Sequence, residues 1–216
     1  MLFRSIRVSA KRLFPNFSFQ DAPFNLKYYK PGHPETEIAY MGCRTRVIGN
    51  VYDKSKEITN RRGNLSFTSI NLPRLAINAN GDVDAFFKEL DHMIDLTADQ
   101  LLERFEIQAR KCVRNYPFLM GQGVWIDSEK LGWNDEVREV LKHGTLTVGF
   151  IGLAETLIAL TGKHHGESPE SQELGLRIVT FMRSKINKFC ETYKHNYSVL
   201  ATPAEGLAGR FTRGDK

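Results

Sequence analysis

The spacing of apolar side chains changes along this chain, and each change marks a different kind of expected element. Residues 65–70 alternate apolar and polar side chains with period two, which predicts a strand. The loosely alternating, β-branched stretch 37–51 predicts an earlier strand, with the polar segment 52–63 as the loop between them. The apolar runs 145–149 and 197–201 predict two more strands.

Helical spacing dominates the stretches between the later strands. Within 83–113 apolar side chains recur every three or four residues behind Asp82, a typical N-cap residue. This predicts one long helix, or two helices that meet near Thr97. Ser168 followed by Pro169 opens another predicted helix, with an apolar face formed by Leu174, Ile178, Phe181, Met182, Ile186, Phe189 and Tyr193.

Shorter helices and turns complete the pattern. Helices are expected at 134–142 and at 153–160, the second closed by Gly162, and a glycine-rich turn at 120–124. Four of the eight prolines fall within the first 37 residues, so extended chain without helix is expected there. Strands that alternate with helices predict an α/β fold with largely parallel strands.

Composition agrees with one compact unit, because 216 residues with 41% hydrophobic and 25% charged content lie in the ordinary globular range. No apolar run reaches the length of a membrane span or a signal peptide, so we expect a cytoplasmic location and no membrane partner. The net charge of +5 is spread among 25 acidic residues. This favours a solvated surface, including the Arg61–Arg62 pair, over nucleic-acid binding.

Few residues suggest metal chemistry. Glu89 and His92 form an ExxH pattern, but di-iron bundles need a second copy, which the sequence lacks. His164 and His165 are interpreted as a solvated loop pair. No metal site is expected in this chain.

The three cysteines are widely separated, which favours reduced thiols over disulfides or zinc ligands. Cys43 lies beside Gly42 between extended segments, so its sulfur could lie on a loop tip, where Arg44 would favour the thiolate. A small buried side chain is the other interpretation of Cys43, and residue type alone favours it. Cys112 and Cys190 fall on apolar faces of predicted helices, where a core role is expected.

A second candidate segment begins at Thr202, directly after the last predicted strand. Thr202 as N-cap, Pro203 at the first helical position and Glu205 three residues after Thr202 form a capping-box pattern. The start of such a helix is an anion site at the place where α/β sheets commonly bind ligands. Two interpretations stay open, namely helix capping alone and phosphate binding.

Several segments together resemble one family. They are MGCRTRV (41–47), RGNLSFTSINLPRLAI (62–77), GTLTVGFIGLAETLIALTGKHHGES (144–168) and NYSVLATPAEGLAGRF (196–211). Through nearly the whole chain, and in the same order, they are similar to the large subunit of the anaerobic, glycyl-radical (class III) ribonucleoside-triphosphate reductases. The resemblance implies a fragment, 1–216, of a ten-stranded α/β barrel with a finger loop near 38–51.

The resemblance also implies roles for single residues. Cys43 would become a thiyl radical at the tip of the finger loop and abstract the ribose 3′ hydrogen. Asn64 matches the polar position of members that use formate as reductant. The substrate-binding positions would be Met41 and Thr45 beside the cysteine and, for the phosphates, Thr202, Ala204, Glu205 and Gly206.

The family's remaining parts would lie outside this chain. These are an N-terminal regulatory domain, a C-terminal zinc site and a segment with the glycyl radical, which a radical S-adenosylmethionine iron–sulfur activase generates. Gly214 is not that glycine, because its neighbours do not resemble the radical segment. We therefore expect a fragment that binds no cofactor and is inactive alone. The complete enzyme would be a homodimer that acts on ribonucleoside triphosphates and formate.

Two other functions fit parts of the sequence. Another glycyl-radical enzyme, a lyase or dehydratase, would share the barrel and the finger-loop cysteine but would have no need to hold a triphosphate. A non-catalytic nucleotide-binding module would use the helix after Thr202 and leave Cys43 inert.

Overall fold

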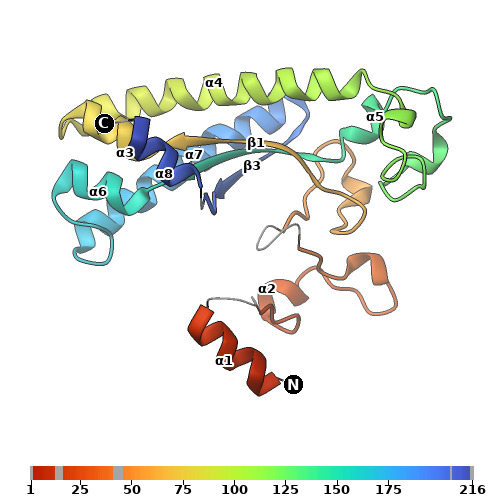
Figure 1. The fold of residues 1–216 in the computed structure, drawn as a ribbon, viewed down its shortest axis with the longest axis horizontal. Coiled ribbons are helices and arrows are strands. Elements are labelled where there is room, and N and C mark those ends of the chain that lie inside the picture. The colour runs from red at the N-terminus through yellow and green to blue at the C-terminus, as the bar shows by residue number, and fades with distance from the viewer. Residues whose placement is uncertain (1, 13–16, 41–45, 205, 215–216) are drawn as a thin grey trace.

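The centre of the fold is a small parallel β-sheet (Figure 1). The computed structural model describes residues 2–12, 17–40, 46–204 and 206–214. Strands β1 (Asn64–Asn71), β2 (Thr145–Ile151) and β3 (Asn196–Ala201) lie side by side in that order, and both pairs are parallel. The α/β class and the parallel pairing predicted from the sequence are therefore confirmed.

Two long helices cover one face of this sheet. Helix α4 (Val83–Ala109) packs on β1 and β2, while α7 (Pro169–Tyr193) packs on β3 and on α4 (Figure 1). Helices α3 (Leu72–Ala79) and α6 (Leu153–Thr161) pack against each other after the ends of β1 and β2. The core lies between sheet and helices and includes Leu146, Val148 and Phe150 of β2.

The ends of these helices follow from local side chains. The carboxylate of Asp82 accepts hydrogen bonds from the N–H groups of Asp84 and Ala85 at 2.9 Å, and α4 then continues unbroken through Thr97. Ser168 caps α7 in the same way. Gly162 ends α6 with a φ of 82°, in the left-handed region that glycine adopts without strain.

Short elements make up most of the rest. Helix α5 (Arg138–Leu141) is shorter than the stretch 134–142 expected from the sequence, and α8 (Leu207–Gly214) follows β3. The remaining short pieces are 3₁₀ turns: η1 (Pro34–Thr36), η2 (Lys54–Lys56), η3 (Val113–Asn115) and η4 (Ser128–Lys130). Among the described residues, no helix is long and apolar enough to cross a bilayer.

The expectation of no helix in the first 37 residues is wrong. Helix α1 (Leu2–Arg12) lies there, apart from the sheet at the bottom of Figure 1, together with the short α2 (Pro23–Leu26). The prolines begin only at Pro15, so nothing interrupts α1. Pro23 occupies the first position of α2, where its missing N–H is no loss.

The strand expected within 37–51 is also wrong for the residues that the structure describes there, 37–40 and 46–51. Side chains, rather than a neighbouring strand, bind their backbone. The hydroxyl of Thr59 accepts a hydrogen bond from the N–H of Ala39, and the amide oxygen of Asn196 accepts one from the N–H of Val51.

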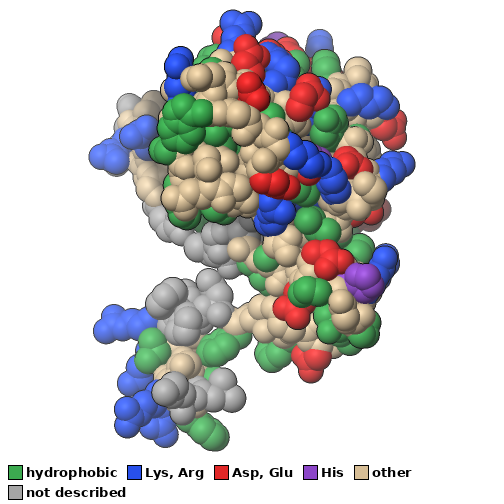
Figure 2. Space-filling model, turned by 90° about the vertical axis from the view of Figure 1, so that its right-hand side faces the viewer, with side chains coloured by type: hydrophobic (Ala, Val, Ile, Leu, Met, Phe, Trp, Pro, Cys, Tyr) green, Lys and Arg blue, Asp and Glu red, His purple; other side chains and the backbone are tan. Residues whose placement is uncertain are grey.

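The surface charge of helix α1 differs from that of the body that contains the sheet. On the face shown in Figure 2, acidic and basic side chains alternate over the body that contains the sheet. Helix α1, in contrast, carries only basic charged residues. The mixed surface of the body agrees with the solvated-surface interpretation.

Helix α4 offers a matched test of the core. Ile94 is 0% exposed and Ile107 on the same helix is 57% exposed. Ile94→Ala should lower the free energy of unfolding by about 2–5 kcal/mol, because it leaves a cavity. Ile107→Ala should change it by less than about 0.5 kcal/mol. Urea titration of both variants measures the difference, and equal losses would contradict the placement of α4 over the sheet.

Candidate functional site

The face of the sheet opposite α4 and α7 carries several small polar side chains, together with Phe67 and Leu200, which pair with Thr147 and Gly149 in the strand register. Because successive side chains of a strand point to opposite faces, the apolar residues of β2 face the helices while Thr145, Thr147 and Gly149 face the other way. The neighbouring strands add Asn64 and Ser198 to this face, within hydrogen-bonding distance of Thr147. We call this surface the polar sheet face.

One row of the polar sheet face joins all three strands. The hydroxyl of Thr147, which is fully buried, lies 2.8 Å from that of Ser198. On its other side, the Asn64 amide is best satisfied with its nitrogen donating to the carbonyls of Thr145 (2.8 Å) and Ser66 (3.1 Å) and its oxygen accepting from Thr147 (3.2 Å). The predicted site residue Asn64 is thus oriented by the sheet itself.

A second polar contact lies near the carboxyl ends of the strands. The hydroxyl of Ser69 on β1 is 2.7 Å from that of Thr202, whose N–H donates to the Phe150 carbonyl at 3.0 Å. This contact crosses over Gly149, where a Cβ atom would stand only 2.2 Å from the Thr202 hydroxyl. Glycine at 149 therefore permits the contact.

Asn64 and Thr202 consequently lie on the same face of the sheet. Thr147 and Gly149, the β2 residues beneath the two polar contacts, are two positions apart, or about 6.6 Å along a strand. The second contact is also placed where parallel sheets commonly bind ligands. The structure thus places these two predicted site residues on one face of the sheet, Asn64 at the beginning of β1 and Thr202 just after the end of β3.

The capping-box prediction at Thr202 is wrong. Helix α8 begins at Leu207, and the N–H groups of Leu207 and Ala208 donate to the carbonyl of Ala204. Thr202 does not cap it, because its N–H continues the sheet pairing and its hydroxyl contacts Ser69. Ala204 has a φ of 53°, an uncommon conformation for a residue with a side chain, and Gly206 is exposed.

Four of the predicted site residues, Met41, Cys43, Thr45 and Glu205, lie outside the described residues. The chain that follows Cys43 is described from Arg46 onward. The Arg46 guanidinium lies over the Phe24 ring at 5.2 Å and donates to the Asn25 side chain. A groove separates residues 46–51 from β3 and α7, and Ser198 is among the residues that line it. This chain segment therefore lies beside the polar sheet face.

Asparagine side chains join residues 50–51 to the beginning of β3. The amide oxygen of Asn196 accepts from the Val51 N–H at 2.6 Å, and its nitrogen donates to Asn50 (3.2 Å) and to the Lys142 carbonyl (2.9 Å). Asn50 and Asn196 are 0% and 4% exposed. Their amide groups thus replace the backbone pairing that a strand would have provided.

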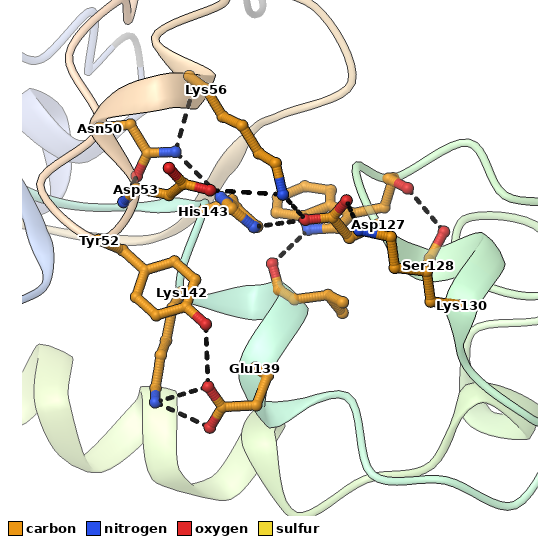
Figure 3. A network of polar contacts seen from close by, with 12 residues as sticks. Asn50, Tyr52, Asp53, Lys56, Asp127, Ser128, Lys130, Glu139, Lys142 and His143 are labelled. Atoms are coloured by element: carbon orange, nitrogen blue, oxygen red, sulfur yellow. Dashed lines mark hydrogen bonds and ion pairs between the residues drawn. The ribbon is translucent and has the colours of Figure 1, made fainter.

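Asn50 also begins a buried polar network (Figure 3). Its amide nitrogen donates to Nδ1 of His143 at 2.9 Å, so Nε2 carries the imidazole proton and donates to Asp127 at 3.1 Å. Burial lowers the pKa of His143 although Asp127 opposes this, which agrees with a neutral ring. Burial alone would raise the pKa of Asp127, but contacts with Lys130 and Lys56 hold it well below its usual range.

The two other cysteines have structural settings. Cys190 is half-buried on α7, as expected, and burial raises the pKa of its thiol. Cys112 is not on a helix face as predicted, because α4 ends at Ala109 and Cys112 lies in the following loop. Within the described ranges, no group of three His, Cys, Asp or Glu side chains is placed to hold a metal.

Sequence reasoning missed three contributors to this region. Ser69, Thr147 and Ser198 were not considered as site residues, although threonines at 145 and 147 share one face of a strand that is otherwise apolar.

Arg62, expected to be solvated, is only 9% exposed. No pattern in the sequence signals its burial, because its partners are backbone carbonyls.

Solved structures with the same fold are anaerobic ribonucleotide reductases. The Thermotoga maritima enzyme with MES in the active site is 18% identical, with a TM-score of 0.59 over 87% of this chain and 29% of that chain. The same enzyme in complex with dATP and CTP is 20% identical, with a TM-score of 0.54 over 72% of this chain and 24% of that one. The fold is thus part of the α/β barrel of these reductases.

Sequence comparison identifies the family. The family model for anaerobic ribonucleoside-triphosphate reductase matches residues 1–216. Reductases of that name from Salmonella typhimurium and Escherichia coli are 33% and 32% identical, each over 81% of this chain. The chain belongs to the anaerobic ribonucleoside-triphosphate reductase family, and it spans about a quarter of the length of the curated relatives it matches.

The contact between Ser69 and Thr202 can be tested through Gly149. Gly149→Ala should lower the free energy of unfolding by about 1–3 kcal/mol, because the new methyl group must displace both hydroxyls. Gly49→Ala is the control, since a Cβ there meets no atom within 4 Å. Chemical denaturation compares the two variants. Equal stability would show that residues 69, 149 and 202 are not packed as described.

Proposed function

We propose that this chain is the part of an anaerobic ribonucleoside-triphosphate reductase that carries the radical cysteine, Cys43, as a single piece of the catalytic barrel. The observation that carries the proposal is the polar sheet face, which holds Asn64 and Thr202 on one side of a parallel sheet. The segment that follows Cys43 runs beside this face. Membership of the anaerobic ribonucleoside-triphosphate reductase family supports the class of reaction, which is ribonucleotide reduction.

The reaction is the replacement of the ribose 2′ hydroxyl by hydrogen. Cys43, as a thiyl radical, takes the hydrogen atom from ribose C3′, so a C–H bond breaks and an S–H bond forms. The 2′ hydroxyl then leaves as water. Formate and one proton supply the two electrons and two protons, and formate becomes carbon dioxide. A glycyl radical on another segment, generated by an activase, would supply the unpaired electron.

Asn64 has a defined part in this proposal. Both hydrogens of its amide are used within the sheet, so Asn64 acts through the Thr147 hydroxyl that it orients. Ser198, the other partner of Thr147, lines the groove beside residues 46–51. Formate is proposed to bind along this row of small polar groups.

The triphosphate is proposed to bind at 202–206. Thr202 lies near the carboxyl end of the sheet, and α8 begins five residues later, at Leu207. The first two N–H groups of α8 donate to the Ala204 carbonyl, so the helix start contributes mainly through its dipole, about 0.3–1 kcal/mol toward an anion. The small residues Ala204 and Gly206 leave the backbone accessible to phosphate oxygens, and Glu205 would have to turn away from them.

The family match favours this function over the two alternatives. A lyase or dehydratase of the glycyl-radical class would not be expected to match a reductase model along residues 1–216. A non-catalytic nucleotide-binding module would leave Cys43 without a role. The setting proposed for the complete enzyme is a cytoplasmic homodimer that makes DNA precursors, with zinc bound outside this chain.

The cysteine assignment is tested by three matched variants in the complete enzyme. Cys43→Ala should abolish turnover, because it removes the sulfur proposed to take the 3′ hydrogen, while the glycyl radical still forms and is seen by electron paramagnetic resonance. Cys112→Ala and Cys190→Ala are the controls and should cost only about 1–2 kcal/mol of stability. Turnover that survives in Cys43→Ala would refute the proposal.

The reductant is tested separately. With isotopically labelled formate, labelled carbon dioxide should appear in a one-to-one ratio with deoxynucleotide. The control replaces formate by a thioredoxin-like dithiol protein, which should not sustain turnover. If the dithiol protein alone supports full turnover, formate is not the reductant and the assignment of Asn64 is incorrect.

A further inference from the structure

Arg62 is a buried arginine whose partners are backbone carbonyls. Its Nε donates to His143 (2.8 Å), one terminal nitrogen donates to Ile48 and Ile58 (3.0 Å each), and the other donates to Gly49 (2.8 Å). Four of the five N–H groups of the guanidinium are thereby used. Among the described residues, no carboxylate forms an ion pair with Arg62.

These carbonyls belong to three separate parts of the chain. Ile48 and Gly49 follow Cys43 by five and six residues, and Ile58 lies in the loop before β1. His143 is two residues before β2, and Arg62 itself is two residues before Asn64. One planar group therefore fixes the segment after Cys43 relative to the beginnings of β1 and β2, two of the three strands that form the polar sheet face.

Fold stability alone gives a poor account of this arrangement. Burying a charge that has no ion-pair partner is costly, even though Glu57 lies near enough to favour the charged form of Arg62. Apolar side chains of similar volume often stabilise a protein as well or better. Burial lowers the pKa of Arg62 to about 10, so the group still carries its charge at neutral pH. What the guanidinium adds is geometry, because its rigid fork holds several acceptors at fixed angles, which the single nitrogen of lysine cannot do.

We infer that Arg62 is a positioning residue, which holds residues 48–51 and thereby sets the place of Cys43 against the polar sheet face. The inference rests on the proposed function of Cys43. Asn196 acts with Arg62, since it holds the next residues of the same segment to β3.

The first experiment tests whether Arg62 holds residues 48–51 in place, and it needs no assay of activity. Amide hydrogen exchange of Val51 in the unmodified chain should be protected, because its N–H is bonded to Asn196. In Arg62→Lys, exchange at Val51 should accelerate by about tenfold or more while the amides of α4 keep their protection. Arg61→Lys is the control, since the Arg61 side chain is 43% exposed and pairs with Glu129.

Two outcomes of this experiment overturn the inference. If Val51 exchanges without protection in the unmodified chain, or equally in both lysine variants, Arg62 does not hold the segment. If α4 loses protection together with Val51, or Arg62→Lys does not fold, the role of Arg62 is general stability instead.

The functional consequence is measured in the complete enzyme. Misplacing a reacting group by about 1 Å can cost about 100-fold in rate, so Arg62→Lys should lower kcat by about 10- to 100-fold. KM for the ribonucleotide should stay within about twofold, because the phosphate site is not touched. The Arg61→Lys variant should match the wild type.

The kinetic result distinguishes failure of the positioning role of Arg62 from failure of the proposed function of Cys43. A rise in KM with unchanged kcat in Arg62→Lys, or unchanged kinetics, overturns the positioning role even when Cys43→Ala is inactive. If Cys43→Ala keeps its turnover, the proposed function fails, whereas the hydrogen exchange at Val51 still decides whether Arg62 holds the segment.

Discussion

The pleat of β2 is the constraint on which both the fold and the site depend. Every second side chain of this strand must face the helices, and Leu146, Val148 and Phe150 fill those positions. The positions between them are then free to carry Thr147 and Gly149, which have small or no side chains. The same strand thus supplies the centre of the core and the floor of the candidate site, and a one-residue shift in register would destroy both.

Polar side chains, rather than further strands, hold the chain that approaches this sheet. The Arg62 guanidinium and the amides of Asn50 and Asn196 bind the backbone of residues 48–51 to the amino ends of the strands. Such contacts depend on direction much more than apolar packing does. A reaction that requires one sulfur atom near one C–H bond would benefit from that precision, which connects the unusual burial of Arg62 to the proposed chemistry.

The sequence predicted the regular elements well because their signals are local. Period-two alternation gave β1, helical spacing gave α4 and α7, and Asp82 marked the beginning of α4 correctly. The failures involve distant partners. Thr202 had the pattern of an N-cap, but Ser69, which is far away in sequence, holds its hydroxyl. Arg62 looked like a solvated loop residue, since carbonyl acceptors leave no trace in a sequence. The site residues themselves came from family resemblance, and among the described ones the structure places Asn64 and Thr202 on the same face of the sheet.

The most direct test of the account is an anaerobic crystal structure of the complete enzyme with a bound ribonucleoside triphosphate. The account predicts that the triphosphate contacts the backbone N–H groups of Ala204, Glu205 and Gly206. It also predicts that the ribose lies over the row formed by Asn64, Thr147 and Ser198, with C3′ next to the sulfur of Cys43. A triphosphate bound away from β3 and α8, or a Cys43 sulfur packed in the core away from the ribose, would contradict it.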